Sequence, residues 1–290
     1  MLASAGAPIR IVEREAPLSP REAVTIALHI VVTAKQVLDP ETPLSALRIE
    51  GDRVAAASNV APVVNGFDEQ AVEAALRIKE AVDGTHITVL SYGTTFALDV
   101  IKKPLAMGAD DLVLLQDPAF ENTIDPMLTV AALVAAIRKL GGVDLVLAGR
   151  QASDWDNAQV PAGIAETLGW PIATIAQAVE VDGTTVRVQR VLPDGHELVE
   201  SDLPAVGTVS NELGAPRYPN MRGIMGARRI QPVVWSAADL GVEPAKVAPA
   251  FEMVSLAAPE RRVETEMITG EDDADAGRKL ALRLREEHLV

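Results

Sequence analysis

The segment Gly149-Arg-Gln-Ala-Ser-Asp-Trp-Asp-Asn-Ala-Gln-Val-Pro-Ala-Gly-Ile-Ala-Glu-Thr-Leu-Gly169 decides the fold class of this chain. It follows the apolar run Val143-Asp-Leu-Val-Leu-Ala148, which is typical of a buried parallel strand. Its second half carries apolar residues at helical spacing, namely Val160, Ile164, Ala165 and Leu168. A strand, a small polar loop and a helix together present backbone N–H groups and a positive helix dipole to an anion, usually a phosphate. The segment therefore predicts a nucleotide site at the carboxyl end of the strand.

This prediction needs support from elsewhere in the chain, because most strand–loop–helix junctions of α/β proteins bind nothing. Neither a GxGxxG fingerprint nor a GxxxxGK[ST] phosphate loop is present. The loop also carries two acids, Asp154 and Asp156, which would repel a phosphate. They are therefore expected to face a ribose or to hold the loop, and Asp156 is expected to cap a helix that begins near Asn157.

Composition excludes several classes of function. The 290 residues are 48% hydrophobic, which suits one large α/β domain with appendages or two small domains. A formal net charge of −15 argues against binding nucleic acid or an anionic membrane. No apolar stretch approaches the roughly 20 residues that span a bilayer. The absence of cysteine excludes disulfides and thiolate metal sites, and it fits a cytoplasmic location.

Helix and strand patterns alternate along the chain, which predicts a doubly wound, mostly parallel sheet of the Rossmann-like type. Strands are expected over 24–34, 87–90, 112–115, 143–148 and 205–210, with a hairpin at 50–52 and another over 179–191. Helices are expected from an N-cap at Asp68 to residue 83, from about 95 to 107, over 127–140 and over 273–289. We expect an N-terminal extension over 1–24, with a short strand at 9–12, and a nucleotide-binding α/β domain over 25–213. A partner-recognition loop and C-terminal arm are expected over 214–290.

The titratable side chains give no sign of metal or hydrolytic chemistry. The histidines share no metal-ligand spacing and none lies in a nucleophile elbow, so we expect no catalytic residue and no metal; they are His29, His86, His196 and His288. His29 lies in an apolar run and is expected to be a hydrogen-bonded residue of the sheet.

The segment Pro216–Arg229 has four arginines and no acid in a strongly acidic chain. Tyrosine, methionine and arginine are favoured at protein–protein contacts, so this basic loop predicts partner recognition. The alternative is an ordinary basic surface loop. The candidate contact residues are Arg217, Tyr218, Met221, Arg222, Ile224 and Met225.

Short motifs spread over about 26–242 resemble the β-subunit of electron transfer flavoprotein. The motifs are Lys35-Gln-Val37, Asn65-Gly-Phe-Asp68, the run Ala71–Glu80, Leu105-Ala-Met-Gly-Ala-Asp110, Gly149-Arg-Gln-Ala152, Gln159-Val160, Trp170-Pro171, Pro216-Arg-Tyr218, Ile224-Met225 and Asp239-Leu-Gly-Val242. The resemblance implies a fold related to the adenine nucleotide α-hydrolases. It also implies an α-subunit that holds most of a redox-active FAD, dehydrogenase donors of the acyl-CoA type and a quinone reductase as acceptor.

By the same resemblance, an adenine nucleotide lies within this chain. Its phosphate would rest on backbone amides of Ala158, Gln159 and Val160. The adenosine end would meet Asn65, Phe67 and Asp68, with Ala34 and Ser91 nearby. The remaining loop residues that we assign to this site are Gln151, Asp154, Asp156 and Asn157. The segment 216–229 matches the recognition loop of the family, and the C-terminal arm would wrap the α-subunit.

Two interpretations of the cofactor bound by this chain stay open, AMP and a second FAD. Simple carriers of the family bind AMP here, whereas electron-bifurcating members bind a second FAD and often read Asp-Gly-Asp-Thr-Ala-Gln-Val-Gly-Pro. This chain reads Asp154-Trp-Asp-Asn-Ala-Gln-Val-Pro-Ala162, with Trp155 where glycine is common. An alternative function of another class is that of a nucleotide-binding regulatory protein of the stress-protein type, which has the same fold. A ligase or sulfurtransferase is disfavoured, because no Ser-Gly-Gly-x-x-Ser loop is present.

Overall fold

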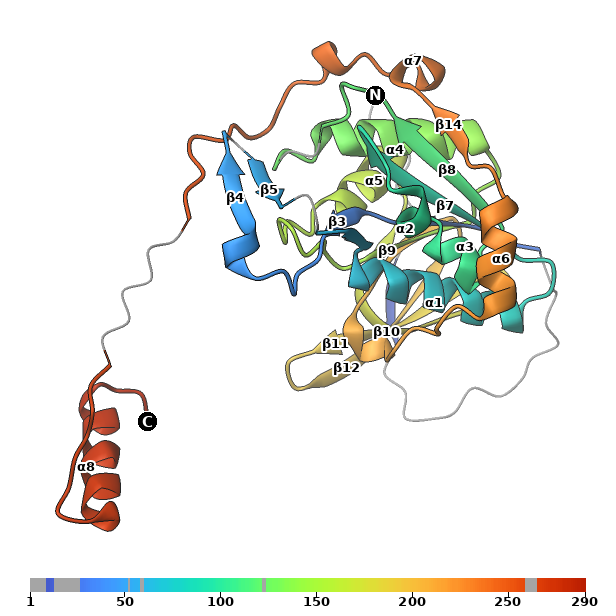
Figure 1. Ribbon diagram of the computed structural model, residues 1–290. Coiled ribbons are helices and arrows are strands. Elements are labelled where there is room, and N and C mark those ends of the chain that lie inside the picture. The colour runs from blue at the N-terminus through green and yellow to red at the C-terminus, as the bar shows by residue number, and fades with distance from the viewer. Residues whose placement is uncertain (1–8, 13–26, 52, 58–59, 122–123, 259–264) are drawn as a thin grey trace. The chain divides into compact units, whose positions relative to one another are not determined.

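A ten-stranded sheet forms the centre of the protein in the computed structural model (Figure 1). The structure describes residues 9–12, 27–51, 53–57, 60–121, 124–258 and 265–290. In order across the sheet, the strands are β1 (Arg10–Val12), β12 (Gly195–Asp202), β11 (Thr185–Leu192), β10 (Ile172–Asp182), β13 (Ala205–Val209), β9 (Leu145–Gly149), β2 (His29–Thr33), β7 (His86–Gly93), β8 (Asp111–Gln116) and β14 (Val233–Trp235).

The strands from β10 to β14 in this order run parallel to one another. The chain passes from β2 to β7 and β8 on one side, and then crosses to β9 on the other side of β2. The strand order therefore reverses between β2 and β9. In open α/β sheets, ligands bind outside the carboxyl ends of the strands at such a reversal. The predicted mostly parallel, doubly wound fold is confirmed.

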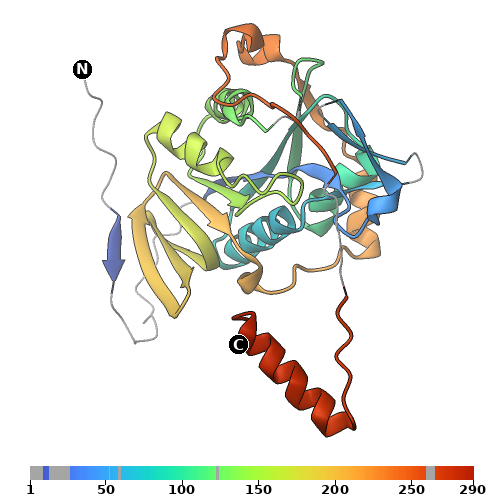
Figure 2. The ribbon, with the colours of Figure 1, turned by 90° about the vertical axis from the view of Figure 1, so that its left-hand side faces the viewer.

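Helices cover both faces of the sheet, as Figure 2 shows in a view turned by 90°. Helices α1 (Gly66–Ala81), α3 (Lys103–Met107) and α6 (Met221–Arg229) pack on one face, and their core contacts include Ala71, Leu105 and Ala227. Helices α4 (Met127–Leu140), α5 (Val160–Leu168) and α7 (Ala237–Leu240) cover the other face. Both cores are built mainly of Ala, Val, Leu and Ile, so the parallel strands are buried on both sides.

Two of the expected helix starts are wrong. Helix α1 begins at Gly66 with Asn65 at the N-cap position, so Asp68 lies inside its first turn. Helix α5 begins at Val160 with Gln159 at the N-cap position, and Asp156 does not cap it. Asp156 and Ala158 have positive φ angles of 52° and 53°, which are incompatible with a helix that begins near Asn157.

The expected helix ending near 107 is two short ones, α2 (Leu98–Ile101) and α3. Pro104 explains the break, because proline lacks the N–H that a continuous helix would need. The stop at Gly108 is confirmed, since this residue has φ 132°. Helix α4 begins and ends at the expected residues.

Antiparallel strands extend one edge of the sheet. Strand β10 is longer than expected: its first half pairs with β13 and its second half with β11. The predicted hairpin and the short strand near 9–12 are confirmed, because β11 pairs with β10 and β1 pairs with β12. The hairpin predicted at 50–52 joins β4 (Leu47–Glu50) to β5 (Arg53–Ala56). A further pair consists of β3 (Gln36–Leu38) and β6 (Pro62–Val64).

The strand expected over 24–34 is β2, and residues 24–26 lie outside the described residues. The segment expected to be a basic loop over 216–229 contains helix α6, and β14 adds an unpredicted parallel strand beside β8.

The chain divides into two compact units, Met1–Val254 and Ser255–Val290. In the second unit, α8 (Asp273–Glu286) confirms the predicted last helix, and Asp272 caps it by accepting a hydrogen bond from the Asp275 N–H. None of the helices in the described ranges combines the length and apolar content needed to cross a membrane.

Candidate nucleotide site

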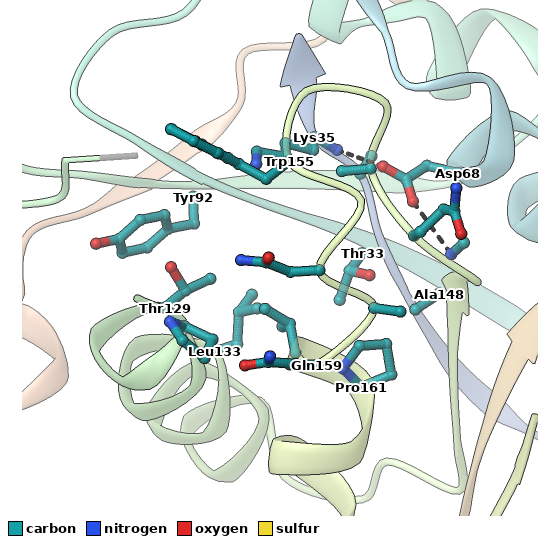
Figure 3. A pocket seen from close by; sticks show the side chains of 18 of the residues that line it. Thr33, Lys35, Asp68, Tyr92, Thr129, Leu133, Ala148, Trp155, Gln159 and Pro161 are labelled. Carbon is teal, nitrogen blue, oxygen red and sulfur yellow. Dashed lines mark hydrogen bonds between the residues drawn. The ribbon is translucent and has the colours of Figure 1, made fainter. Parts of the chain in front are cut away.

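A cavity of about 120 Å³ lies at the carboxyl ends of β2 and β9, where the strand order reverses (Figure 3). This volume is below the roughly 300–1,000 Å³ of typical ligand pockets, so a nucleotide would extend from the cavity onto its rim. The lining comes from the ends of β2, β7 and β9, from the loops 124–126 and 151–159, and from α4 and α5. The sheet topology therefore places the cavity where the sequence predicts a nucleotide.

The turn before α5 exposes backbone donors beside this cavity. Ala158 has φ 53°, and Gln159 follows with φ −99°. Successive residues of opposite handedness direct neighbouring N–H groups to one side, which makes an anion-binding concavity. Among the described residues, none accepts a hydrogen bond from the N–H of Ala158, Gln159 or Val160. These are the three amides to which the family resemblance assigns phosphate binding.

Asp68 joins the two strands that flank the reversal. Its carboxylate accepts hydrogen bonds from the N–H of Lys35 at 2.8 Å and from that of Gly149 at 3.1 Å. Burial raises the pKa of Asp68 to about 7, although both hydrogen bonds oppose the shift. A Cβ on Gly149 would come within 2.5 Å of the same carboxylate, so glycine is required for this close approach.

Asn65 fixes the beginning of the loop 151–159. Its Nδ2 donates to the carbonyl of Gln151 at 2.8 Å, and its Oδ1 accepts from the N–H of Ser153 at 3.3 Å. The Asn65 side chain is therefore engaged by this loop, although the residue is the N-cap of α1. The buried amide holds the loop across a sequence separation of more than 80 residues.

Further polar contacts hold the rest of the loop. The Lys35 ammonium lies 2.8 Å from the carboxylate of Asp154. Gln151 donates from Nε2 to Asp156 at 2.8 Å, and Asn157 donates from Nδ2 to the carbonyl of Ile124 at 2.7 Å. The two acids thus hold the loop, which is one of the roles that the sequence suggests for them.

The structure brings most of the predicted site residues together. Those that line the cavity are Ala34, Asp68, Gln151, Asn157, Ala158, Gln159 and Val160. Asn65, Asp154 and Asp156 are not part of the lining, but their side chains contact Gln151 and Lys35, which are. Phe67 is not part of the lining, and the Arg150 guanidinium lies 5.1 Å from the centre of its ring.

Ser91 is also outside the cavity. Its neighbours Leu90 and Tyr92 both line the cavity, and side chains alternate along a strand, so Ser91 faces the other side of the sheet. There its hydroxyl is buried, with no hydrogen-bond partner among the described residues.

One wall of the cavity was missed by sequence reasoning. Tyr92 stacks on Phe120 with 4.8 Å between ring centres, and Thr129 and Leu133 of α4 lie nearby in Figure 3. Burial raises the pKa of the Tyr92 hydroxyl well above its usual range. The predicted strand ended at residue 90 and left Tyr92 outside it, whereas β7 continues to Gly93.

Trp155 lines the cavity but does not fill it. In Figure 3 its indole lies near Lys35, on the opposite side of the view from Thr129, Leu133 and Pro161. A bulky residue in this loop is therefore compatible with a bound ligand.

The residues predicted for partner recognition lie around α6. Tyr218 is 92% exposed, Met221 72% and Met225 47%. Arg222 is exposed, while Ile224 is half-buried and lines a separate groove. We refer to these five residues as the docking surface. Arg217 differs from them, because its guanidinium is bound by Glu73 and Glu80 of α1.

His29 is hydrogen-bonded as expected, with its ring Nε2 2.9 Å from the hydroxyl of Thr88 and its N–H bonded to Asp144. In the part of the chain that the structure describes, no three acidic or histidine side chains gather as ligands for a metal ion.

The mostly parallel sheet with helices on both faces, the reversed strand order and the cavity at the reversal define a Rossmann-like α/β protein. A family model described as the electron transfer flavoprotein domain matches residues 52–240. The chain therefore belongs to the electron transfer flavoprotein family, and its role is electron transfer.

The relatives are similar over most of the chain. The caffeyl-CoA reductase-Etf complex subunit CarD of Acetobacterium woodii is 36% identical over 273 residues, which are 91% of this chain and 100% of that protein. The electron transfer flavoprotein subunit beta of Clostridium acetobutylicum is 35% identical over 91% of this chain and 100% of its own. The electron transfer flavoprotein subunit beta of Mycobacterium leprae is also 35% identical, and the match covers 90% of this chain and 99% of that protein.

Proposed function

We propose that this chain carries an adenine nucleotide, AMP, in the cavity at the end of β2 and β9. The amides of Ala158, Gln159 and Val160, which have no acceptor within the described ranges, are the observation that carries this proposal. They would hold the phosphate, because amide donors and the positive end of α5 both favour a negative charge. The adenosine would lie along Ala34, Asp68 and Gln151.

We further propose that the chain forms a heterodimer with an α-subunit that holds most of a redox-active FAD. The flavin supplies the redox chemistry when it is bound, and this chain supplies orientation and docking. Electrons would pass from dehydrogenases of the acyl-CoA type to a quinone reductase or another acceptor in the cytoplasm. The docking surface supports this proposal, because it combines exposed apolar and cationic side chains in a chain of net charge −15.

The test is to co-express the chain with an α-subunit of the family and to quantify flavin and AMP in the purified complex. We expect one FAD and one AMP per heterodimer, and little flavin on the chain alone. A complex without a nucleotide in this chain would contradict the cavity assignment. A stable, flavin-replete form of the isolated chain would contradict the shared flavin.

A second FAD in the cavity is the alternative, and one observation favours it. The cavity has the aromatic side chains of Tyr92 and Trp155, on which a second flat ring could stack. Two flavins and no AMP per heterodimer would establish this alternative.

A further inference from the structure

We propose that Arg217 is a positioning residue, which holds the docking surface in place and does not itself contact the partner. The proposal rests on the docking function proposed above. It replaces the direct contact that the sequence suggests for this arginine with a contact inside the chain.

Arg217 is bound to α1 through both its backbone and its side chain. Its N–H donates to Glu73 Oε2 at 3.1 Å, and its Nε donates to the same oxygen at 2.7 Å. The other end of the guanidinium reaches Glu80, with 2.5 Å between Nη1 and Oε1. One planar guanidinium therefore bridges two carboxylates on the same face of α1, a geometry that a lysine ammonium does not reproduce.

We refer to the contacts of Arg217 with Glu73 and Glu80 as the clasp. Glu73 is its buried acceptor, since the residue is only 5% exposed. Burial raises its pKa, but hydrogen bonds from Arg217 and Arg77 outweigh burial and hold the pKa below its usual value. Arg77 also donates to the carbonyl of Leu213 at 3.3 Å. The backbone on the N-terminal side of Tyr218 is therefore tied to α1 at two points.

The C-terminal side of Tyr218 is fixed by a different contact. Helix α6 packs on α3 so closely that a Cβ on Gly223 would collide with the carbonyl oxygen of Ala106. Asn220 caps α6 by accepting a hydrogen bond from the Gly223 N–H at 2.8 Å. Tyr218, which is almost fully exposed, thus lies between two anchored segments.

This arrangement lowers the conformational entropy that the segment around Tyr218 loses when a partner binds. An exposed aromatic anchor binds more tightly when its backbone is already in the bound conformation. The charge of Arg217 is meanwhile compensated by two carboxylates, so a partner would sense the positive charge of Arg222 more strongly. The clasp therefore predicts that loss of Arg217 loosens the segment.

The first test measures amide exchange by mass spectrometry in the heterodimer with the α-subunit. Arg217→Gln and Glu73→Gln are each expected to accelerate exchange over residues 216–222 about tenfold, because each removes a charged hydrogen bond. The double variant should exchange no faster than either single one. Arg228→Gln, which removes an equal charge from α6, and the peptide 127–140 serve as controls. Unchanged exchange in both single variants would overturn the proposal.

The second test measures electron transfer from an acyl-CoA dehydrogenase with its acyl-CoA substrate. We expect Arg217→Gln, Arg217→Lys and Glu73→Gln to raise KM for the dehydrogenase about fivefold at unchanged kcat, since preorganisation acts on binding. Glu73 is buried and is not available to a partner, so its effect reports the clasp. A normal KM for Glu73→Gln and Arg217→Lys, with a raised KM for Arg217→Gln, would mean direct charge recognition and would overturn it.

Two further variants distinguish a failure of the clasp from a failure of the proposed docking function. If Glu73→Gln fails to fold, Glu80→Gln replaces it, because Glu80 is a surface residue that contacts the same guanidinium. Tyr218→Ala tests the docking surface itself. If it leaves KM unchanged, the proposed docking function fails, while the exchange measurement still decides whether the clasp orders the segment.

Discussion

Asp68 Oδ1 accepts a hydrogen bond from the Gly149 N–H at 3.1 Å, and no side chain fits at position 149 beside it. This contact joins the first turn of α1 to the end of β9, two segments that are 81 residues apart in sequence. Gly149→Ala should therefore push α1 from the sheet and lower the free energy of unfolding by about 1–3 kcal/mol. Denaturant unfolding measures the loss, and Gly169→Ala is not a suitable control because φ is positive there. Gly66→Ala, with open space around its Cβ, is the matched control.

The raised pKa of Asp68 predicts a pH dependence of stability. Between pH 3.8 and about 7 the folded protein binds more protons at this site than the unfolded chain does. The stability contributed by Asp68 is therefore present at low pH and is lost as the pH rises through this window, with a slope of at most about 1.4 kcal/mol per pH unit. Asp68→Asn should remove this slope. Urea unfolding of the nucleotide-free protein at pH 5 and pH 8 measures it, and parallel pH profiles for the two proteins would refute the assignment.

The left-handed conformation of Ala158 predicts opposite effects of two substitutions. Ala158→Gly removes strain at φ 53° and should stabilise the nucleotide-free protein by about 1 kcal/mol while AMP binding is retained. Ala158→Val keeps the same N–H but disfavours the turn, so we expect at least tenfold weaker AMP binding. Calorimetric titration with AMP compares them. Equal affinity in both variants would show that the turn does not present the phosphate-binding amides.

Trp155 at the edge of the cavity predicts a spectroscopic signal. AMP binding should change the tryptophan emission of the protein, and Trp155→Phe should abolish that change although Trp170 and Trp235 remain. Trp155→Ala should raise the Kd for AMP about three- to tenfold, because an aromatic contact contributes about 0.5–1.5 kcal/mol, whereas Trp155→Phe should keep most of the affinity. An emission change that persists in Trp155→Phe would place the ligand elsewhere.

Gly223 and Gly226 of α6 predict a contrast between neighbouring positions. A Cβ at 223 would collide with the carbonyl of Ala106, while a Cβ at 226 meets nothing within 4 Å. Gly223→Ala should displace α6 and weaken binding of the dehydrogenase without loss of AMP. Gly226→Ala should bind the dehydrogenase normally and stabilise α6 by about 0.5–1 kcal/mol. Surface plasmon resonance with the dehydrogenase measures the first effect, and equal binding by both variants would argue against a fixed α6.

Local patterns predicted the elements whose residues interact mainly with their own neighbours. Helix α4 and the turn at Gly183 between β10 and β11 follow from periodicity and turn residues. The helix starts at 66 and 160 were mispredicted, because Asp68 and Asp156 have the side chains of N-caps but find other donors in the fold. Strand β14 has three residues and no alternation to detect, and its pairing with β8 depends on the sheet already being formed.

The candidate site shows the same division. The loop between β9 and α5 could be predicted because strand, loop and helix are contiguous in sequence, and the resemblance to the family directed attention to the amides of Ala158, Gln159 and Val160 within it. Tyr92 and its support by Phe120 could not, because this contact joins β7 to a loop that follows another strand.

By itself the sequence determined the alternation of strands and helices, and with it the doubly wound fold and the place of the turn before α5, for which we propose phosphate binding. These follow from residue order and side-chain periodicity, which are local properties. The tertiary structure alone decided that Asp68 is a buried link between strands and that Arg217 is bound to α1. Both roles depend on which distant groups lie within hydrogen-bonding distance, and packing of the helices on the sheet sets those distances.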